Sequence, residues 1–219
     1  MPRAVQYVLS VHEQVPSFDE QLQLAILEVI RLDCKQESAN RPRYIRLVFE
    51  LLTASAHSVK YEAATTLTGL TLNPAAIKGE YLIINYIRVL TVNTAAASCY
   101  IELAVKESDN NVKLIVLDRL EALRQKHEHV LDPLVMDILR VLSSPDLEVR
   151  RKAVNIALAM VTSRNVEEVV VFLKKQLQRT MVEEPRIRNH QCEHLFFHLQ
   201  RTGDRHDTKY SSEGKTRRL

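Results

Sequence analysis

The residues of this sequence best suited to bind a metal ion are His190, Cys192, His194 and His198, near the C-terminus. His194 and His198 are four residues apart, so they could share one face of a helix, as zinc ligands do. No second cysteine pair completes a four-ligand set. The cluster is therefore interpreted as a chance arrangement, and we expect the chain to bind no metal.

Other signatures of chemistry are missing from the sequence. It has neither a Gly-rich phosphate loop nor a Gly-Lys-Ser/Thr motif, and no Ser/His/Asp or Cys/His arrangement is supported. The acid pairs at 167–168 and 183–184 lie at predicted helix ends, where capping or hydration explains them. His127 and His129 fall in a predicted inter-helix turn and are expected to be solvated. We therefore predict no enzyme activity and no cofactor.

Three basic residues, Lys60, Lys113 and Arg150, each follow a valine near a predicted helix start. Each base could pair with an acid in the turn of the neighbouring repeat and so build a ladder. Alternatively, the bases could present a charged stripe to an acidic partner. The ladder is favoured because residues 1–184 carry a formal charge of −1. Exposed pairs of this kind each contribute only ~0–1 kcal/mol.

The elements that carry these bases are short amphipathic helices. Only four glycines occur, and apolar residues recur at helical spacing between polar turns. Val112 and Val149 are 37 residues apart, close to the length of a two-helix HEAT repeat. We therefore predict an all-α, HEAT/armadillo-like solenoid of antiparallel helix pairs, with a right-handed superhelix.

Local signals predict where several helices begin. Ser17 and Glu20 have the spacing of a capping box, and Pro42 suits a first helical turn. Asp132-Pro133 and Ser144-Pro145-Asp146 are further predicted starts. For the helix after Ser108, the predicted inward stripe is Val112, Ile115, Val116, Arg119 and Leu120. Leu117 and Ile138 are expected to be core residues.

One segment, Gly79–Thr94, interrupts the repeat. Val59 and Val112 are 53 residues apart, and removing these sixteen residues restores the spacing of 37. The segment is rich in Tyr, Ile and Val, which predicts β structure rather than helix. The codons at its start can contain a sequence like a splice donor, and those at its end a sequence like a splice acceptor. We therefore hypothesise that the segment is a retained intron. A genuine loop insertion is the alternative, and the apolar run of ~12 residues is too short to span a membrane.

Charge is unevenly distributed along the chain. The formal net charge is +3, and residues 185–219 alone carry +4. This tail is expected to be poorly ordered, and a nucleic-acid-binding role would rest on it alone. The cysteines Cys34, Cys99 and Cys192 are odd in number and far apart, and Met1 is followed by no secretory signal. We therefore expect free thiols in a reducing compartment.

Several stretches resemble a known family, the β subunits of coatomer, which belong to the COPI vesicle coat. The most specific is Glu107–Leu120 (ESDNNVKLIVLDRL). Asp137–Arg151, Ser163–Val169, Val59–Ala64 and Pro16–Leu24 also agree. The resemblance covers roughly residues 5–78 and 95–184, while 79–94 and 185–219 look foreign to the family.

The resemblance implies a central piece of an adaptin-like trunk over residues 1–184, incomplete at both ends. It implies a non-enzymatic scaffold for vesicle transport between Golgi and ER and within the Golgi. The expected partners are other coat subunits and, through the complete coat, an Arf-family GTPase and cargo. The expected location is cytoplasmic, peripheral on Golgi membranes and COPI vesicles, and no partner-binding residue is assigned. The alternative is another HEAT-repeat adaptor: a clathrin-adaptor large chain, or a scaffold for nuclear transport or a phosphatase.

Overall fold

The structure is a computed structural model that describes residues 2–35, 38–71, 82–127 and 131–183. Within these ranges every regular element is a helix, which confirms the all-α prediction. The α-helices are α1 (Pro2–Ser10), α2 (Glu20–Asp33), α3 (Arg41–Leu51), α4 (His57–Thr71), α5 (Leu82–Lys106), α6 (Asn110–Lys126), α7 (Val135–Leu139), α8 (Leu147–Leu158) and α9 (Val166–Glu183). The 3-10 segments are η1 (Val15–Ser17), η3 (Asp132–Leu134) and η4 (Arg140–Ser143). None of the described helices is long and apolar enough to cross a membrane.

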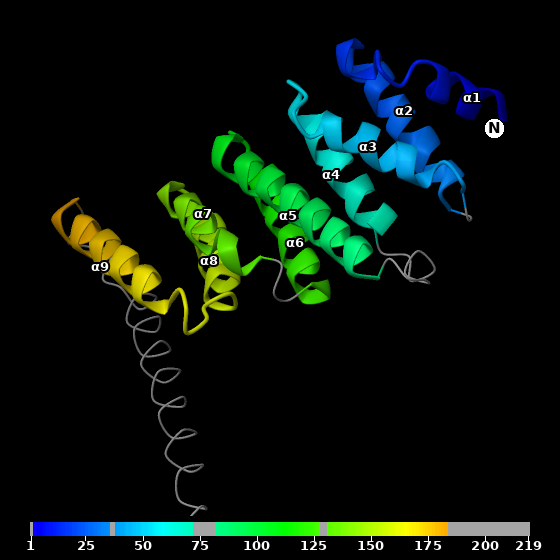
Figure 1. The fold of residues 1–219 in the computed structure, drawn as a ribbon. Helices are drawn as coiled ribbons and strands as arrows, with labels where there is room; N and C mark the ends of the chain where they lie inside the picture. The colour runs from blue at the N-terminus through cyan, green and yellow to red at the C-terminus, as the bar shows by residue number, and fades with distance from the viewer. Residues whose placement is uncertain (1, 36–37, 72–81, 128–130, 184–219) are drawn as a thin grey trace, which may run out of the picture. The chain divides into compact units, whose positions relative to one another are not determined.

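The chain divides into two compact units, Met1–Ser163 and Arg164–Leu219. In the first unit, α3 packs on α4, α5 on α6 and α7 on α8, and each pair is joined by a connection of a few residues. The second helices of these pairs also contact one another, because α2 packs on α4, α4 on α6 and α6 on α8 (Figure 1). This stacking of helix pairs is the HEAT/armadillo-like solenoid arrangement that the repeat spacing predicts.

The core of the first unit lies between these stacked helices. Equivalent faces of α4 and α8 are fully or almost fully buried: Val59, Ala63, Leu67, Val149, Ala153, Ile156 and Ala157. Alanines at these positions let neighbouring helices approach closely. Leu117 of α6 and Ile138 of α7 are both 0% exposed, which confirms their prediction as core residues.

The start of α2 differs from its prediction. Asp19, rather than Ser17, is the cap: its Oδ1 accepts a hydrogen bond from the Leu22 N–H at 2.9 Å. The Ser17 hydroxyl instead donates to the Gln14 carbonyl at 2.6 Å, because Ser17 ends the 3-10 turn η1. The capping box was therefore wrong, while Pro42 does lie in the first turn of α3, as expected.

Aspartates cap the two helices that carry the repeated motif. Asp109 accepts from the Asn111 N–H at 2.7 Å before α6, and Asp146 accepts from the Val149 N–H at 2.9 Å before α8. Asp132 and Pro133 begin the 3-10 turn η3 rather than an α-helix. A helical segment does begin at Asp132, as predicted, but the α-helix α7 begins only at Val135.

We expect Asp146→Ala to lower the free energy of unfolding by about 1 kcal/mol, because the Val149 N–H loses its acceptor at a helix start. The measurement is the urea midpoint of the full chain. Asp137→Ala is the matched control, since Asp137 is half-exposed in the first turn of α7, where no side chain caps the helix. An equal loss in both variants would contradict the capping role.

The β-structure prediction for Gly79–Thr94 was wrong in the described part. Residues from Leu82 onward form one continuous helix, α5, which ends at Lys106. Its second half presents a buried face to α4, including Ala96, Ala97 and Tyr100. A helix fixed by this packing extends easily toward its N-terminus, and intrinsic β propensity is too weak to oppose it. Residues 79–81 lie outside the described residues.

The predicted stripe of α6 was also partly wrong. Val116 and Leu120 are buried, but Val112 is 38% exposed and Ile115 is 50% exposed. Lys113 takes the inward position and is only 7% exposed, since the methylene stem of a lysine can cover apolar surface. The equivalent motif valines of α4 and α8 are fully buried, so the face of α6 is turned relative to its neighbours.

Candidate interaction surface

No group of three or more potential metal ligands occurs in the ranges that the structure covers. The cluster formed by His190, Cys192, His194 and His198 lies outside the described residues, as does His129. His127 follows the last turn of α6 and is half-buried, so the expectation of a solvated side chain was wrong. Burial lowers the pKa of His127, and the neighbouring Lys126 ammonium lowers it further.

Cys34 and Cys99 are free thiols, as predicted, while Cys192 is outside the described ranges. Cys99 is buried between α5 and α4, and burial raises its pKa to about 11. A thiol with so high a pKa is a weak nucleophile at neutral pH. Cys99 is therefore a core residue rather than a reactive one.

The most organised polar feature is a series of side-chain contacts across the second helices of successive pairs, α2, α4, α6 and α8. Each contact joins one helix to the next, so the series runs through all four. We call this series the polar ladder, and its members are Arg31–Glu62, Arg119–Tyr61 and Lys152–Asp118. The Arg119 Nε–H donates to the Tyr61 hydroxyl at 3.0 Å.

The starts of the same helices are joined as well. The Ser58 hydroxyl of α4 donates to Glu20 at the start of α2. The Asn110 Nδ2 of α6 donates to Asp146, the cap of α8, at 3.3 Å. His57 of α4 lies 2.9 Å from Glu107, which directly follows α5. These contacts fix the register between neighbouring helix pairs.

The structure gives different outcomes for the three motif bases. Lys60 does pair across helices, with its Nζ 3.1 Å from Glu102 Oε1 of α5, although the acid lies in a helix rather than a turn. Hydrogen bonds from Lys106 and then Lys60 lower the pKa of Glu102. Lys113 is buried and Arg150 is half-buried, and no ion pair is seen for either within the described residues. The ladder hypothesis is therefore right for Lys60 only in that its partner belongs to the next helix pair. It is wrong for Lys113 and Arg150, and the contacts of the polar ladder are made by other residues.

Sequence reasoning missed the acids and the tyrosine of the polar ladder. Glu62 and Asp118 each sit near the motif valine of their own helix, where an opposite charge one repeat away could have suggested a pair. Tyr61 gave no such signal, because a tyrosine at helical spacing among apolar residues resembles a core residue. Its hydroxyl reaches the surface, where Arg119 binds it.

Glu107 carries the largest electrostatic perturbation of this surface. The hydrogen bond with His57, followed by that from the Ser108 N–H at 2.7 Å, lowers the pKa of the Glu107 carboxyl to about 2. Both donors favour the charged carboxylate. A lowered pKa stabilises the fold at pH values above the ordinary value of 4.5, and this contribution disappears as the pH falls toward 2.

We therefore expect the difference in urea midpoint between the wild type and Glu107→Gln to be present at about pH 6 and to shrink at about pH 3. Unfolding would be followed by circular dichroism at both pH values. Glu121→Gln on α6 is the control for removing one acid. A Glu107→Gln difference that stays constant over this pH range would contradict the role of the carboxylate.

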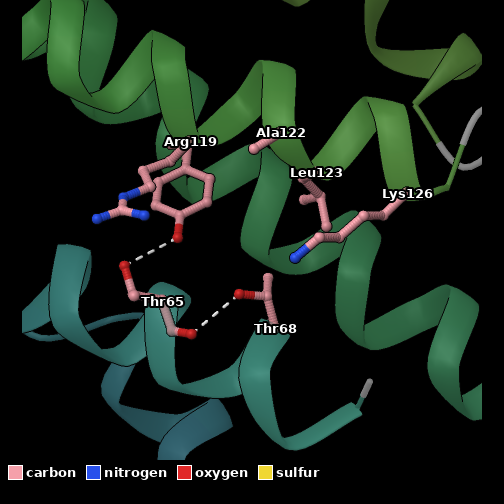
Figure 2. A pocket seen from close by; sticks show the side chains of 7 residues that line it. Thr65, Thr68, Arg119, Ala122, Leu123 and Lys126 are labelled. Atoms are coloured by element: carbon pink, nitrogen blue, oxygen red, sulfur yellow. Dashed lines mark hydrogen bonds between the residues drawn. The ribbon is translucent and has the colours of Figure 1, made fainter. Parts of the chain in front are cut away.

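A small hollow opens beside the polar ladder where α4, α5 and α6 meet (Figure 2). Its volume is about 80 Å³, and the residues that line it are Thr65, Thr68, Tyr100, Arg119, Ala122, Leu123 and Lys126. The Thr65 and Tyr100 hydroxyls lie 3.0 Å apart and share one hydrogen bond. Burial raises the pKa of Tyr100 to about 12, so this hydroxyl stays neutral. The hollow thus offers neutral hydroxyls between two cationic side chains.

Comparison with known proteins shows which family this chain resembles. The family model described as the adaptin N-terminal region matches residues 1–196. The chain is 51% identical over 180 residues to coatomer subunit beta of Rattus norvegicus, which covers 81% of this chain and 17% of the rat protein. It is 49% identical over 180 residues to that of Drosophila melanogaster, with the same coverage. With coatomer subunit beta of Dictyostelium discoideum, identity is 43% over 182 residues, or 83% of this chain and 18% of the relative.

Proposed function

This chain belongs to the adaptin N-terminal region family, and from that membership we propose that it acts as a structural scaffold of the COPI vesicle coat. The single observation that carries the proposal is the 51% identity to a coatomer subunit beta over 180 residues, or 81% of this chain. The chain spans about 17% of the length of that relative, so the proposal concerns one section of a coat subunit.

The physical basis of such a role is positioning rather than catalysis. Stacked helix pairs present a long surface whose parts keep fixed relative positions. In the first unit the polar ladder joins α2, α4, α6 and α8, so a partner bound at one pair is held in register with a partner at the next. We expect no bond-making step, no cofactor and no metal.

The proposed partners are other coatomer subunits and, through the complete coat, an Arf-family GTPase and cargo. The proposed location is cytoplasmic and peripheral, on Golgi membranes and COPI vesicles. No residue of this chain is assigned to the GTPase. The basic residues 185–219, on which a nucleic-acid role would rest, lie outside the described part of the chain.

The test is affinity purification of the tagged chain from cells, with the bound proteins identified by mass spectrometry. We expect coatomer subunits to be recovered. Recovery of a nuclear-transport receptor or a phosphatase in their place would favour the alternative adaptor function and overturn the proposal.

A further inference from the structure

The exposed face of α6 carries a regular stripe of side chains, of which only Arg119 makes a polar-ladder contact within the described residues. Five residues form it, at alternating spacings of three and four: Val112, Ile115, Arg119, Ala122 and Lys126. All five are exposed. This is the spacing of the contact positions of a two-stranded coiled coil, which lie along one side of a helix. We call these five residues the α6 seam.

The N-terminal half of the α6 seam is apolar. Val112 is 38% exposed and Ile115 is 50% exposed, whereas the motif valines of α4 and α8 are fully buried. The turned face of α6 places Lys113 inward and these two apolar side chains outward. Exposing apolar residues while burying a lysine lowers the stability of the isolated helix stack.

The C-terminal half of the α6 seam is cationic. Arg119 donates its Nε–H to Tyr61 and lines the hollow drawn in Figure 2. Lys126 extends toward the hollow from the other side in the same view. Over the described residues no ion pair joins either cation to an acid, and Glu62 pairs with Arg31. Two cations on the same stripe of α6 are thus available to an external ligand.

We propose that the α6 seam binds an acidic amphipathic helix of a partner protein, which rests on the proposed scaffold function. Its apolar residues would cover Val112 and Ile115, and its acids would meet Arg119 and Lys126. Arg119 and Lys126 are seven positions apart, which corresponds to ~10.5 Å along α6 and matches the distance between acids two turns apart on a facing helix. The small side chain of Ala122 between them lets the two helices approach closely.

A lipid bilayer or a nucleic acid fits the surface less well. Only two large apolar side chains, Val112 and Ile115, are exposed on the seam, fewer than an interfacial helix inserts into a membrane. Asp118, whose side chain is 62% exposed and pairs with Lys152, lies directly beside the seam, so the surface is not the continuous cationic strip that a phosphate backbone requires. An acidic partner helix needs negative charge only at the positions that face Arg119 and Lys126. Neutral residues can face Asp118.

The binding test uses the full chain and a synthetic, fluorescently labelled helical peptide of about 15 residues. The peptide carries two leucines followed by two glutamates at the spacings of the seam, with alanine and glutamine elsewhere. A peptide with the reverse order of leucines and glutamates is also tested, because the partner helix could lie parallel or antiparallel to α6. A second peptide replaces the glutamates by lysines. Because the chain is tested alone, this measurement is independent of whether coatomer subunits are recovered from cells.

We expect the wild type to bind the glutamate peptide in at least one direction and not the lysine peptide. The double variant Arg119→Glu, Lys126→Glu should lose about ten-fold or more in affinity for the glutamate peptide and gain affinity for the lysine peptide. Ile115→Gln should also weaken binding without altering the urea midpoint. Arg46→Glu, an exposed base on α3, is the control and should leave binding unchanged.

Equal binding of both peptides, or an equal effect of Arg46→Glu, would overturn the proposal. So would a failure of all peptides while vesicles rich in phosphatidylserine bind and are released by the Arg119 and Lys126 changes. A gain of lysine-peptide binding by the double variant cannot follow from misfolding, so that result would support the proposal directly.

Discussion

Replacing Leu117 by alanine is expected to lower the free energy of unfolding by ~2–5 kcal/mol. Leu117 is 0% exposed and lies on the inward face of α6, a helix that packs on α4, α5 and α8. Alanine removes buried apolar surface and leaves a cavity that rigid stacked helices fill only in part. A chain of this size has a total stability of ~5–15 kcal/mol, so the loss is a large fraction of it.

Chemical denaturation followed by circular dichroism measures this effect. Ile115→Ala is a matched control, because Ile115 lies on the same helix and is 50% exposed. We expect the control to change stability by no more than ~0.5 kcal/mol. If the two variants lost similar stability, the inward and outward faces of α6 would be wrongly assigned.

Deleting Gly79–Thr94 is expected to raise the soluble yield of the chain several-fold while preserving cooperative unfolding. Among the residues of α5 whose burial is described, Ala96, Tyr100, Ile101 and Leu103 are buried and lie after the deletion. The deleted residues instead contain a long run rich in Tyr, Ile and Val with few charges. Before α5 packs on α4, such a run can pair with other copies of itself and aggregate.

The comparison is made by expressing both chains and measuring soluble protein and the urea unfolding curve. Deleting an equal number of residues from 203–218 is the control for chain length. Equal soluble yields for the wild type and the Gly79–Thr94 deletion would count against the prediction. We also propose that this segment is a retained intron. Transcripts that always contain the corresponding bases would refute that origin without affecting the folding result.

Several features of the fold could be predicted because they depend on neighbours in the sequence. The polar turns before α6 and α8 contain the aspartates that cap them, and the apolar spacing predicts helices on both sides. The repeat length predicts stacked pairs, since one amphipathic pair cannot bury its own apolar face. The Glu107–Leu120 stretch was enough to suggest the family that the comparisons confirm.

Other features depended on contacts between distant residues. The β prediction for residues 82–94 failed because packing of α5 on α4 outweighs a weak local preference. The polar ladder could not be predicted in full, because its partners lie about 30 to 60 residues apart and periodicity does not say which side chains meet.

The sequence alone determined that this chain is helical, that its helices form repeating pairs and that it resembles a coat scaffold. These properties follow from composition, spacing and local capping, which act over a few residues. Tertiary structure decided how each helix is rotated about its own axis, and so which of its residues are buried. A rotation of α6 buries Lys113 and exposes Val112 and Ile115, although the motif around them matches its neighbours. Packing against both adjacent helices sets that rotation, so only the folded stack reveals the α6 seam.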